Sequence, residues 1–186
     1  TPLQLCLMTA QIANGGYPIK PKIIVDNNPI SYEDAKQSME SQLFFNKDAE
    51  FLEDKKLFKN ERNIKIIQEA MFSSTNEQYG TSYKSRIDDP KYQFAGKTGT
   101  AQVKRISKRE RELDLELEQI PYKDRDHALY VAYGPYSNPR YALSIIVEHG
   151  GSGSKAAAPI AKELFKLIID RHELRNKQSN FERIKI

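Results

Sequence analysis

The stretch HALYVAYGPYSNPRYALSIIVEH, residues 127–149, decides the fold. Within it, two apolar and aromatic segments, 127–134 and 140–149, flank the turn-forming residues 135–139. Because proline, asparagine and serine favour turns, we expect the two segments to pair as an antiparallel hairpin. Their near-continuous apolar runs are typical of central strands that are covered on both faces. The hairpin therefore predicts a sheet packed between helices.

Two helices are expected ahead of this hairpin. Thr1 and Gln4 have the spacing of a capping box, and the glycines at 15–16 end the first helix. Asn60 is a helix cap, and its helix is expected to end near Ser73. The expected apolar sides are Leu5, Met8, Ile12 and Ala13 in the first helix, and Ile64, Ile67, Ala70 and Met71 in the second.

A last helix is expected at 154–172, after the glycine-rich turn at 150–153. Pro159 fits this helix only within its first turn. The polar tail at 173–186 is expected to fray. The expected apolar side of the helix consists of Ile160, Leu164, Leu167 and Ile168.

Two charged segments interrupt these elements. Residues 32–60 are expected to form a surface excursion, preceded by a short edge strand at 23–25 that lies between prolines. Residues 104–126 form a second segment that is dense in charges of both signs. A solvated loop or short helix is the simpler interpretation of this charged loop, and a lip that faces a partner or a substrate is the alternative.

Composition bounds the possible functions. A length of 186 residues is typical of one domain. The net charge of +4 is small and the charged residues are of both signs, so the electrostatic field is weak, which argues against nucleic-acid binding. No apolar run in the chain is long enough to cross a bilayer, and we recognise no signal peptide in it. A single cysteine, Cys6, excludes an internal disulfide framework and is expected to be a packed small residue. We expect no metal and no cofactor, because the three histidines are scattered: His127, His149 and His172.

The residues that carry chemistry are Lys97, Thr98, Gly99 and Thr100, within a third strand expected at 92–103. A lysine and two hydroxyls are costly to bury, so we expect this strand at an edge. Strand periodicity places the two threonine side chains together on one face. There the hydroxyls could hold a carboxylate, the ammonium could add charge, and the N–H near Thr100 could point at an oxyanion. Gly99 would let a ligand lie close to the backbone. An ordinary edge strand is the alternative.

The Lys-Thr-Gly element belongs to a wider pattern along the chain. Lys-Thr-Gly is the third motif of the penicillin-recognising serine enzymes. Several separate blocks resemble, in order, the penicillin-binding protein 2 family of class B, elongation-specific peptidoglycan D,D-transpeptidases. The blocks are TPLQL at 1–5, ANGG at 13–16, GT at 80–81, AGKTGTAQV at 95–103, DHALYVAYGPYSNP at 126–139 and IVEHGGSG at 146–153.

The resemblance implies a mixed α/β fold of the α+β type, with a central, largely antiparallel sheet between helices, as in serine β-lactamases. Residues 1–172 would then be the C-terminal portion of a transpeptidase domain. Lys97, Thr98, Gly99 and Thr100 would bind the terminal carboxylate of a peptidoglycan stem peptide or of a β-lactam, and the Thr100 backbone would serve the oxyanion hole. The resemblance also implies an inner-membrane anchor outside this chain, a periplasmic location, and a lipid-II polymerase of the shape, elongation, division and sporulation family as partner.

The sequence departs from the family at the nucleophile. No Ser-x-x-Lys precedes Lys97, so we expect the nucleophilic Ser and its Lys base to be absent from this chain and the chain alone to be inactive. The Ser-x-x-Lys at 152–155 follows Lys-Thr-Gly and lies in the glycine-rich turn, so we reject it as the nucleophile. Residues 74–76 match the second motif by letters, but we interpret them as a loop that ends a helix. A D,D-carboxypeptidase, a serine β-lactamase and a non-catalytic β-lactam sensor or scaffold remain the alternatives.

Overall fold

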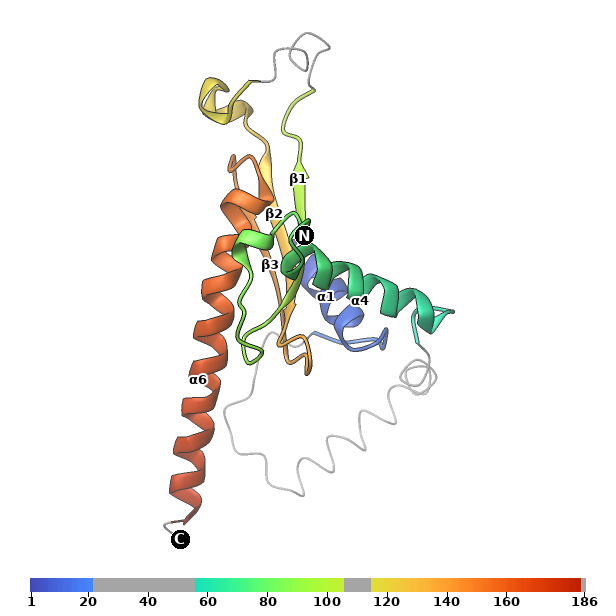
Figure 1. The fold of residues 1–186 in the computed structure, drawn as a ribbon, viewed down its shortest axis with the longest axis vertical. Helices are drawn as coiled ribbons and strands as arrows, with labels where there is room; N and C mark the ends of the chain where they lie inside the picture. The colour runs from blue at the N-terminus through green and yellow to red at the C-terminus, as the bar shows by residue number, and fades with distance from the viewer. Residues whose placement is uncertain (22–55, 106–114, 185–186) are drawn as a thin grey trace.

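The computed structural model describes residues 1–21, 56–105 and 115–184, the last nine of these by their backbone alone. Its strands are β1 (Ala95–Ala101), β2 (His127–Gly134) and β3 (Tyr141–Val147), which form an antiparallel sheet in the order β1-β2-β3. Helices α1 (Pro2–Ala13) and α4 (Glu61–Asn76) lie on one side of the sheet, and α6 (Ala158–Ile184) runs along the other (Figure 1). The predicted fold class, a sheet packed between helices, is confirmed.

The hairpin forms as predicted. β2 has the expected bounds, and its register with β3 runs from Ala128 opposite Val147 to Gly134 opposite Tyr141. The expectation that both strands are central is wrong for β3, which borders the described part of the sheet. Helices on both faces keep β3 largely covered, and an apolar run alone cannot distinguish such an edge strand from a central one.

The first core lies between the sheet and α6. Here Tyr130 of β2 and Phe165 of α6 are fully buried, and Phe94 stacks on Phe165 with ring centroids 4.8 Å apart. The remaining buried members are Ile87, Ala128, Ala132, Ala157, Ala158 and Ala161. The alanines have small side chains that let α6 approach the strands closely.

The predicted apolar side of α6 is right only in part, because Leu164 and Ile168 are half-buried. Ile160 and Leu167 are exposed, whereas Ala161, Phe165 and Ile169 are buried. A π-helical turn, Gly153–Ala157, directly precedes α6. The alanines contribute to the buried stripe without standing out as apolar in the sequence. Pro159 lies in the first turn, as expected.

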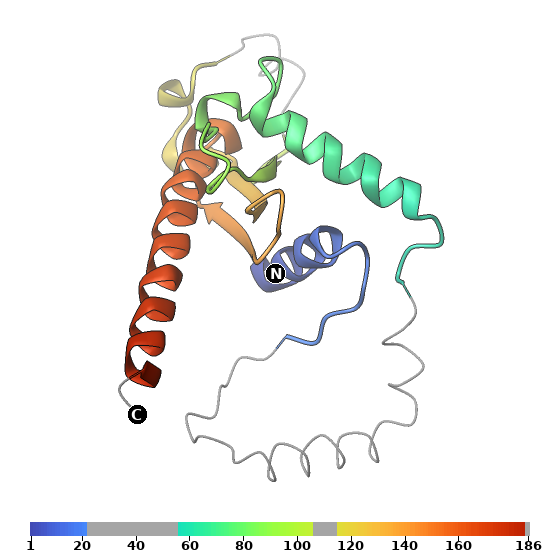
Figure 2. The ribbon, with the colours of Figure 1, turned by 60° about the horizontal axis from the view of Figure 1, so that its bottom comes forward.

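The last helix is longer than predicted. The helical backbone of α6 continues to Ile184, past the expected end at residue 172, and extends beyond the sheet (Figure 2). The Nζ atom of Lys91 contacts Asp170 at 3.0 Å and Glu173 at 2.9 Å. The Tyr92 hydroxyl donates to the same Asp170 carboxylate at 2.6 Å. These contacts hold α6 at Asp170 and Glu173, on either side of its predicted end.

The second core lies on the opposite face, where α1 and α4 pack on the sheet through Ile12, Met71, Ala95 and Tyr133. The capping box of Thr1 and Gln4 is present. Helix α4 ends at Asn76, three residues beyond the predicted Ser73, so residues 74–76 are helical and not a loop. Met8 and Ala70 were expected on apolar sides but are exposed.

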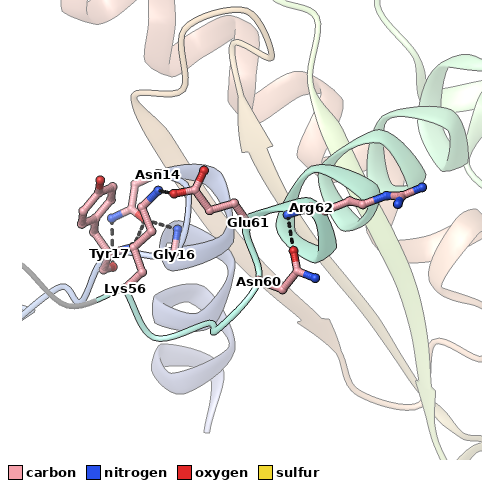
Figure 3. Close-up of polar contacts among 7 residues, drawn as sticks. All are labelled: Asn14, Gly16, Tyr17, Lys56, Asn60, Glu61 and Arg62. Carbon is pink, nitrogen blue, oxygen red and sulfur yellow. Dashed lines mark hydrogen bonds and ion pairs between the residues drawn. The ribbon is translucent and has the colours of Figure 1, made fainter.

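The end of α1 and the start of α4 lie side by side (Figure 3). The side-chain oxygen of Asn14 accepts from the N–H groups of Gly16 at 3.1 Å and Tyr17 at 3.0 Å, which closes α1. The Gly16 carbonyl accepts from the Leu57 N–H at 2.8 Å. Gly16 has φ +94°, and a Cβ there would be 2.3 Å from Ile64 of α4. A glycine at this position therefore permits both the turn and the close helix contact.

The charged segments are described only in part. The predicted strand at 23–25 and the excursion up to residue 55 lie outside the described residues, as do residues 106–114 of the charged loop. The described part of that loop contains two short 3-10 helices, Leu117–Gln119 and Tyr122–Asp124, in line with the simpler interpretation. Across 1–21, 56–105 and 115–184, we find no helix with the length and apolarity that a membrane crossing requires.

Candidate substrate-binding strand

The structure places Lys97, Thr98, Gly99 and Thr100 in β1, at the edge of the described sheet. Lys97 lies opposite Val131 and Thr98 opposite Tyr130, so the two side chains start from opposite faces, as strand periodicity predicts. Lys97 and Thr100 are exposed, whereas Thr98 and Gly99 are half-buried. The expected edge position is therefore confirmed, and the polar side chains reach solvent.

The Lys97 ammonium lies beside Thr98 despite starting from the other face. Its Nζ atom donates to the Thr98 carbonyl at 2.9 Å and to the Thr98 hydroxyl at 3.3 Å. A positive charge and a hydroxyl thus stand together at the strand edge. This pair matches the donors that hold a carboxylate through charge-assisted hydrogen bonds.

The backbone of β1 presents alternate residues to its free edge. In an antiparallel pair, each residue directs both its N–H and its C=O toward the partner strand or away from it. The carbonyl of Phe94, just before β1, accepts from Asn76 of α4 at 2.9 Å, and that of Thr98 accepts from Lys97. The alternation therefore directs the Thr100 N–H to the same unpaired edge.

A chain of hydroxyls leads away from Thr98. Its Oγ1 atom lies 3.3 Å from Oγ1 of Thr81, which lies 3.2 Å from Oγ of Ser74. Ser74 belongs to the last turn of α4, and Thr81 belongs to the loop that follows. The sequence pattern did not identify these contacts, because Thr81 lies 17 residues before Thr98 and Ser74 a further seven residues back.

The glycine-rich turn approaches β1 from the α6 side. A Cβ on Gly153 would lie 2.4 Å from the Leu129 carbonyl oxygen and 2.8 Å from that of Gly99. Such distances to backbone atoms leave no room for a side chain. Gly153 is thus a supporting residue of the strand, although the sequence indicated only a turn there.

The two rejected motifs make local contacts. Ser152 Oγ lies 2.9 Å from Ser154 Oγ, and Lys155 is exposed. Asn76, in the last turn of α4, donates to the Phe72 and Phe94 carbonyls at 3.0 and 2.9 Å. Both arrangements suit a structural role.

Two of the three histidines meet, which their spacing did not predict. The Nδ1 atom of His127 accepts from the His149 N–H at 2.9 Å. No cluster of three or more His, Cys, Asp or Glu side chains that could hold a metal occurs in the described ranges.

Cys6 donates to the Ala142 carbonyl at 3.4 Å, and burial raises the pKa of its thiol. This thiol is therefore a packed group, as predicted.

One pocket of about 150 Å³ lies between α1 and β3. Its lining consists of Ala10, Ala13, Asn14, Ile19, Pro139, Arg140, Tyr141 and Ala142. None of these residues belongs to the 97–100 segment, so this pocket is separate from the candidate site.

Comparisons with known proteins agree with these features. The sequence profile described as "Penicillin binding protein transpeptidase domain" matches residues 1–166. Peptidoglycan D,D-transpeptidase MrdA of Acinetobacter baumannii is 30% identical over 164 residues, which are 86% of this chain and 21% of that protein. MrdA of Salmonella typhimurium is 35% identical over 105 residues, which are 56% of this chain and 16% of that protein. The chain thus spans about a fifth of the length of these curated relatives.

Solved structures of penicillin-binding protein 2 resemble the chain. The Pseudomonas aeruginosa protein, solved in complex with WCK 5153, has a TM-score of 0.58 and 28% identity, covering 90% of this chain and 30% of that one. The Helicobacter pylori protein in complex with MreC has a TM-score of 0.57 and 27% identity, covering 90% of this chain and 25% of that one. The profile match over most of the chain, together with an edge strand that carries Lys-Thr-Gly, identifies the chain as a member of the penicillin-binding protein transpeptidase domain family.

Proposed function

We propose that this chain contributes the substrate-binding strand of a peptidoglycan D,D-transpeptidase, which cross-links the cell wall through a serine acyl-enzyme. The observation that carries the proposal is the meeting of the Lys97 ammonium and the Thr98 hydroxyl at the edge of β1 that no described strand pairs with. The names of the curated relatives support transpeptidation over the carboxypeptidase, β-lactamase and sensor alternatives.

Each residue of the strand has a distinct role in the proposal. Lys97, Thr98 and Thr100 bind the carboxylate of the terminal D-alanine of a stem peptide, or the equivalent carboxylate of a β-lactam. Gly99 has no side chain, so the ligand backbone can lie close to the backbone of β1. The Thr100 N–H donates to the oxyanion that develops at the scissile carbonyl, and loss of one such donor costs about 100- to 1,000-fold in rate.

The acylated serine and its lysine base are not assigned to this chain. No Ser-x-x-Lys precedes Lys97 in the 186 residues, and the motif at 152–155 follows the strand instead. We propose that the chain by itself forms no acyl-enzyme. A labelled penicillin should leave it unmodified. Covalent labelling that disappears in Ser152→Ala would overturn this proposal and assign the nucleophile to Ser152.

The proposed setting is the periplasmic face of the bacterial inner membrane, with a lipid-II polymerase of the shape, elongation, division and sporulation family as partner. Support comes from the family resemblance. For a relative, the solved complex of the Helicobacter pylori protein with MreC shows assembly with another protein. Co-purification of the full-length gene product with the polymerase tests the partner.

A carboxylate-dependent binding assay tests the role of β1. We expect an N-acyl-D-alanyl-D-alanine peptide to shift the amide resonances of Thr98 and Thr100 in the labelled chain, and its methyl ester to shift them much less. Thr98→Val keeps the shape of the side chain and removes its hydroxyl, so it should weaken binding of the acid alone. Equal responses to acid and ester in the unmodified chain would refute the carboxylate-binding role.

A further inference from the structure

A buried cluster of hydroxyls lies directly behind the Lys-Thr-Gly strand. Tyr130 Oη lies 2.9 Å from Thr75 Oγ1 and 3.1 Å from Ser82 Oγ, and the latter two atoms lie 3.3 Å apart. All three residues are at most 1% exposed. They come from β2, from the last turn of α4 and from the loop after it, so the hydroxyl cluster of Tyr130, Thr75 and Ser82 joins three separate segments.

The direction of the hydrogen bonds within this cluster is constrained. Ser82 Oγ donates its one proton to the Ser74 carbonyl at 2.9 Å. Ser82 can then accept from Tyr130 or from Thr75, and Thr75 has a further acceptor in the Met71 carbonyl at 3.4 Å. A buried hydroxyl without a partner is costly, so removal of one member leaves the others to rearrange or remain unpaired.

The Tyr130 hydroxyl reaches this cluster only because Gly96 has no side chain. A Cβ on Gly96 would lie 2.3 Å from Tyr130 Oη and 2.5 Å from the ring carbon that bears it. The tyrosine therefore passes behind β1 immediately before Lys97. Burial raises the pKa of the Tyr130 hydroxyl above its ordinary value, so the group stays a protonated donor to higher pH than a free tyrosine.

The cluster also fixes the loop that contacts Thr98. Ser82 is held twice by the Ser74 carbonyl, through its side chain and through its N–H at 3.0 Å. Its neighbour Thr81 then lies with Oγ1 3.3 Å from Oγ1 of Thr98. The buried cluster, through Ser82, and the Ser74 hydroxyl, 3.2 Å from Thr81 Oγ1, together hold Thr81 beside Thr98. Thr81 in turn limits the rotation of the Thr98 hydroxyl.

The geometry points to Tyr130 as a positioning residue that acts through Ser82 and Thr81 to orient the Thr98 hydroxyl toward a substrate carboxylate. This inference rests on the proposed function of β1. Tyr130 does not itself touch the substrate: its hydroxyl is buried behind the strand, and Thr98 is the group that binds.

The test compares benzylpenicillin with its methyl ester in acylation of the full-length gene product. Tyr130→Phe keeps the ring and removes the hydroxyl. We expect it to slow acylation by benzylpenicillin about 2- to 10-fold, which corresponds to the free energy of one hydrogen bond. The rate of acylation by the methyl ester should be unchanged. Thr75→Val, which removes a second member of the cluster, should have the same selective effect.

Tyr133→Phe is the matched control, because Tyr133 is a buried tyrosine of the same strand whose hydroxyl has no partner among the described residues. It should alter neither rate. In the 186-residue chain, amide hydrogen exchange at 80–100 should be faster in Tyr130→Phe and unchanged in Tyr133→Phe.

The outcomes separate the two proposals. An unchanged acid rate in Tyr130→Phe, or an equal loss with acid and ester, would overturn the positioning role, because a general structural defect affects both ligands. Unchanged exchange at 80–100 would overturn it as well. A wild-type protein that acylates equally fast with acid and ester would instead refute the carboxylate-binding function of β1 itself.

Discussion

Glycines set the distances around the candidate site. Gly96 leaves space for the Tyr130 hydroxyl, and Gly153 lets the turn before α6 approach the backbone of β1 and β2. The two positions face different neighbours but share one constraint: the nearest atoms belong to an aromatic ring or to backbone, neither of which moves easily. Gly99 differs, since the nearest neighbour of a Cβ there is Leu129 Cβ at 3.3 Å.

We predict that Gly153→Ala destabilises the chain strongly. The added Cβ would overlap two backbone carbonyls, and overpacking of this kind costs about 1–3 kcal/mol or more. Chemical denaturation monitored by circular dichroism measures the loss. Gly99→Ala is the matched comparison and should cost clearly less, because only a small shift of Leu129 is needed. Equal losses in the two variants would contradict the close approach of Gly153.

At the scale of elements, the start of α4 depends on one cap. The side-chain oxygen of Asn60 accepts from the Arg62 N–H at 2.9 Å (Figure 3). The next residue, Glu61, pairs with Lys56 of the preceding loop, and this contact lowers the pKa of the Glu61 carboxyl. Helix α4 carries Ser74 and Thr75 at its other end, so its placement also affects the hydroxyl cluster.

We expect Asn60→Ala to reduce the free energy of unfolding by about 1 kcal/mol, because one N–H of the first turn loses its acceptor. Asn60→Asp keeps an acceptor at the same place and should restore most of this loss. Thermal or urea denaturation measures both variants. An alanine variant as stable as the wild type would show that the cap contributes nothing.

At the scale of the whole molecule, the sheet separates two cores, each with a buried tyrosine of β2. Tyr130 lies in the core beneath α6, and Tyr133 lies in the core beneath α1 and α4. Burial raises the pKa of both hydroxyls, and the charge of a neighbouring Tyr136 raises that of Tyr133 further. An unfolded tyrosine titrates near pH 10.

Alkaline pH should therefore destabilise the fold. Above about pH 10, the unfolded chain loses tyrosine protons that the native chain retains, so the free energy of unfolding falls by up to about 1.4 kcal/mol per pH unit for each such tyrosine. Tyr133→Phe removes one of these groups and should make the decline shallower, with little cost at pH 7. Urea denaturation from pH 7 to pH 11 measures this, and parallel declines would contradict the prediction.

Much of the fold could be predicted from local signals. The hairpin at 127–149, the capping box of Thr1 and Gln4, the Asn60 cap and the end of α1 before the glycines at 15–16 depend on neighbouring residues, and these predictions are confirmed. Predictions of which helix residues are buried were less accurate. The buried stripe of α6 contains Ala161 and Phe165 instead of Leu167, because packing against the sheet, and not apolar character alone, decides which side is buried. The tail was expected to fray because it is polar and terminal, and its contact with Lys91 joins residues that are distant in sequence.

The sequence by itself determined the family and the candidate strand, since the motif blocks, their order and the polar Lys97–Thr100 segment are properties of the linear chain. Only the tertiary structure placed Thr81 beside Thr98, Tyr130 behind Gly96 and Gly153 against the strand. These contacts join residues that are 17 to 54 positions apart. Their geometry depends on how α4, α6 and the sheet pack together, and local residue preferences do not specify that packing.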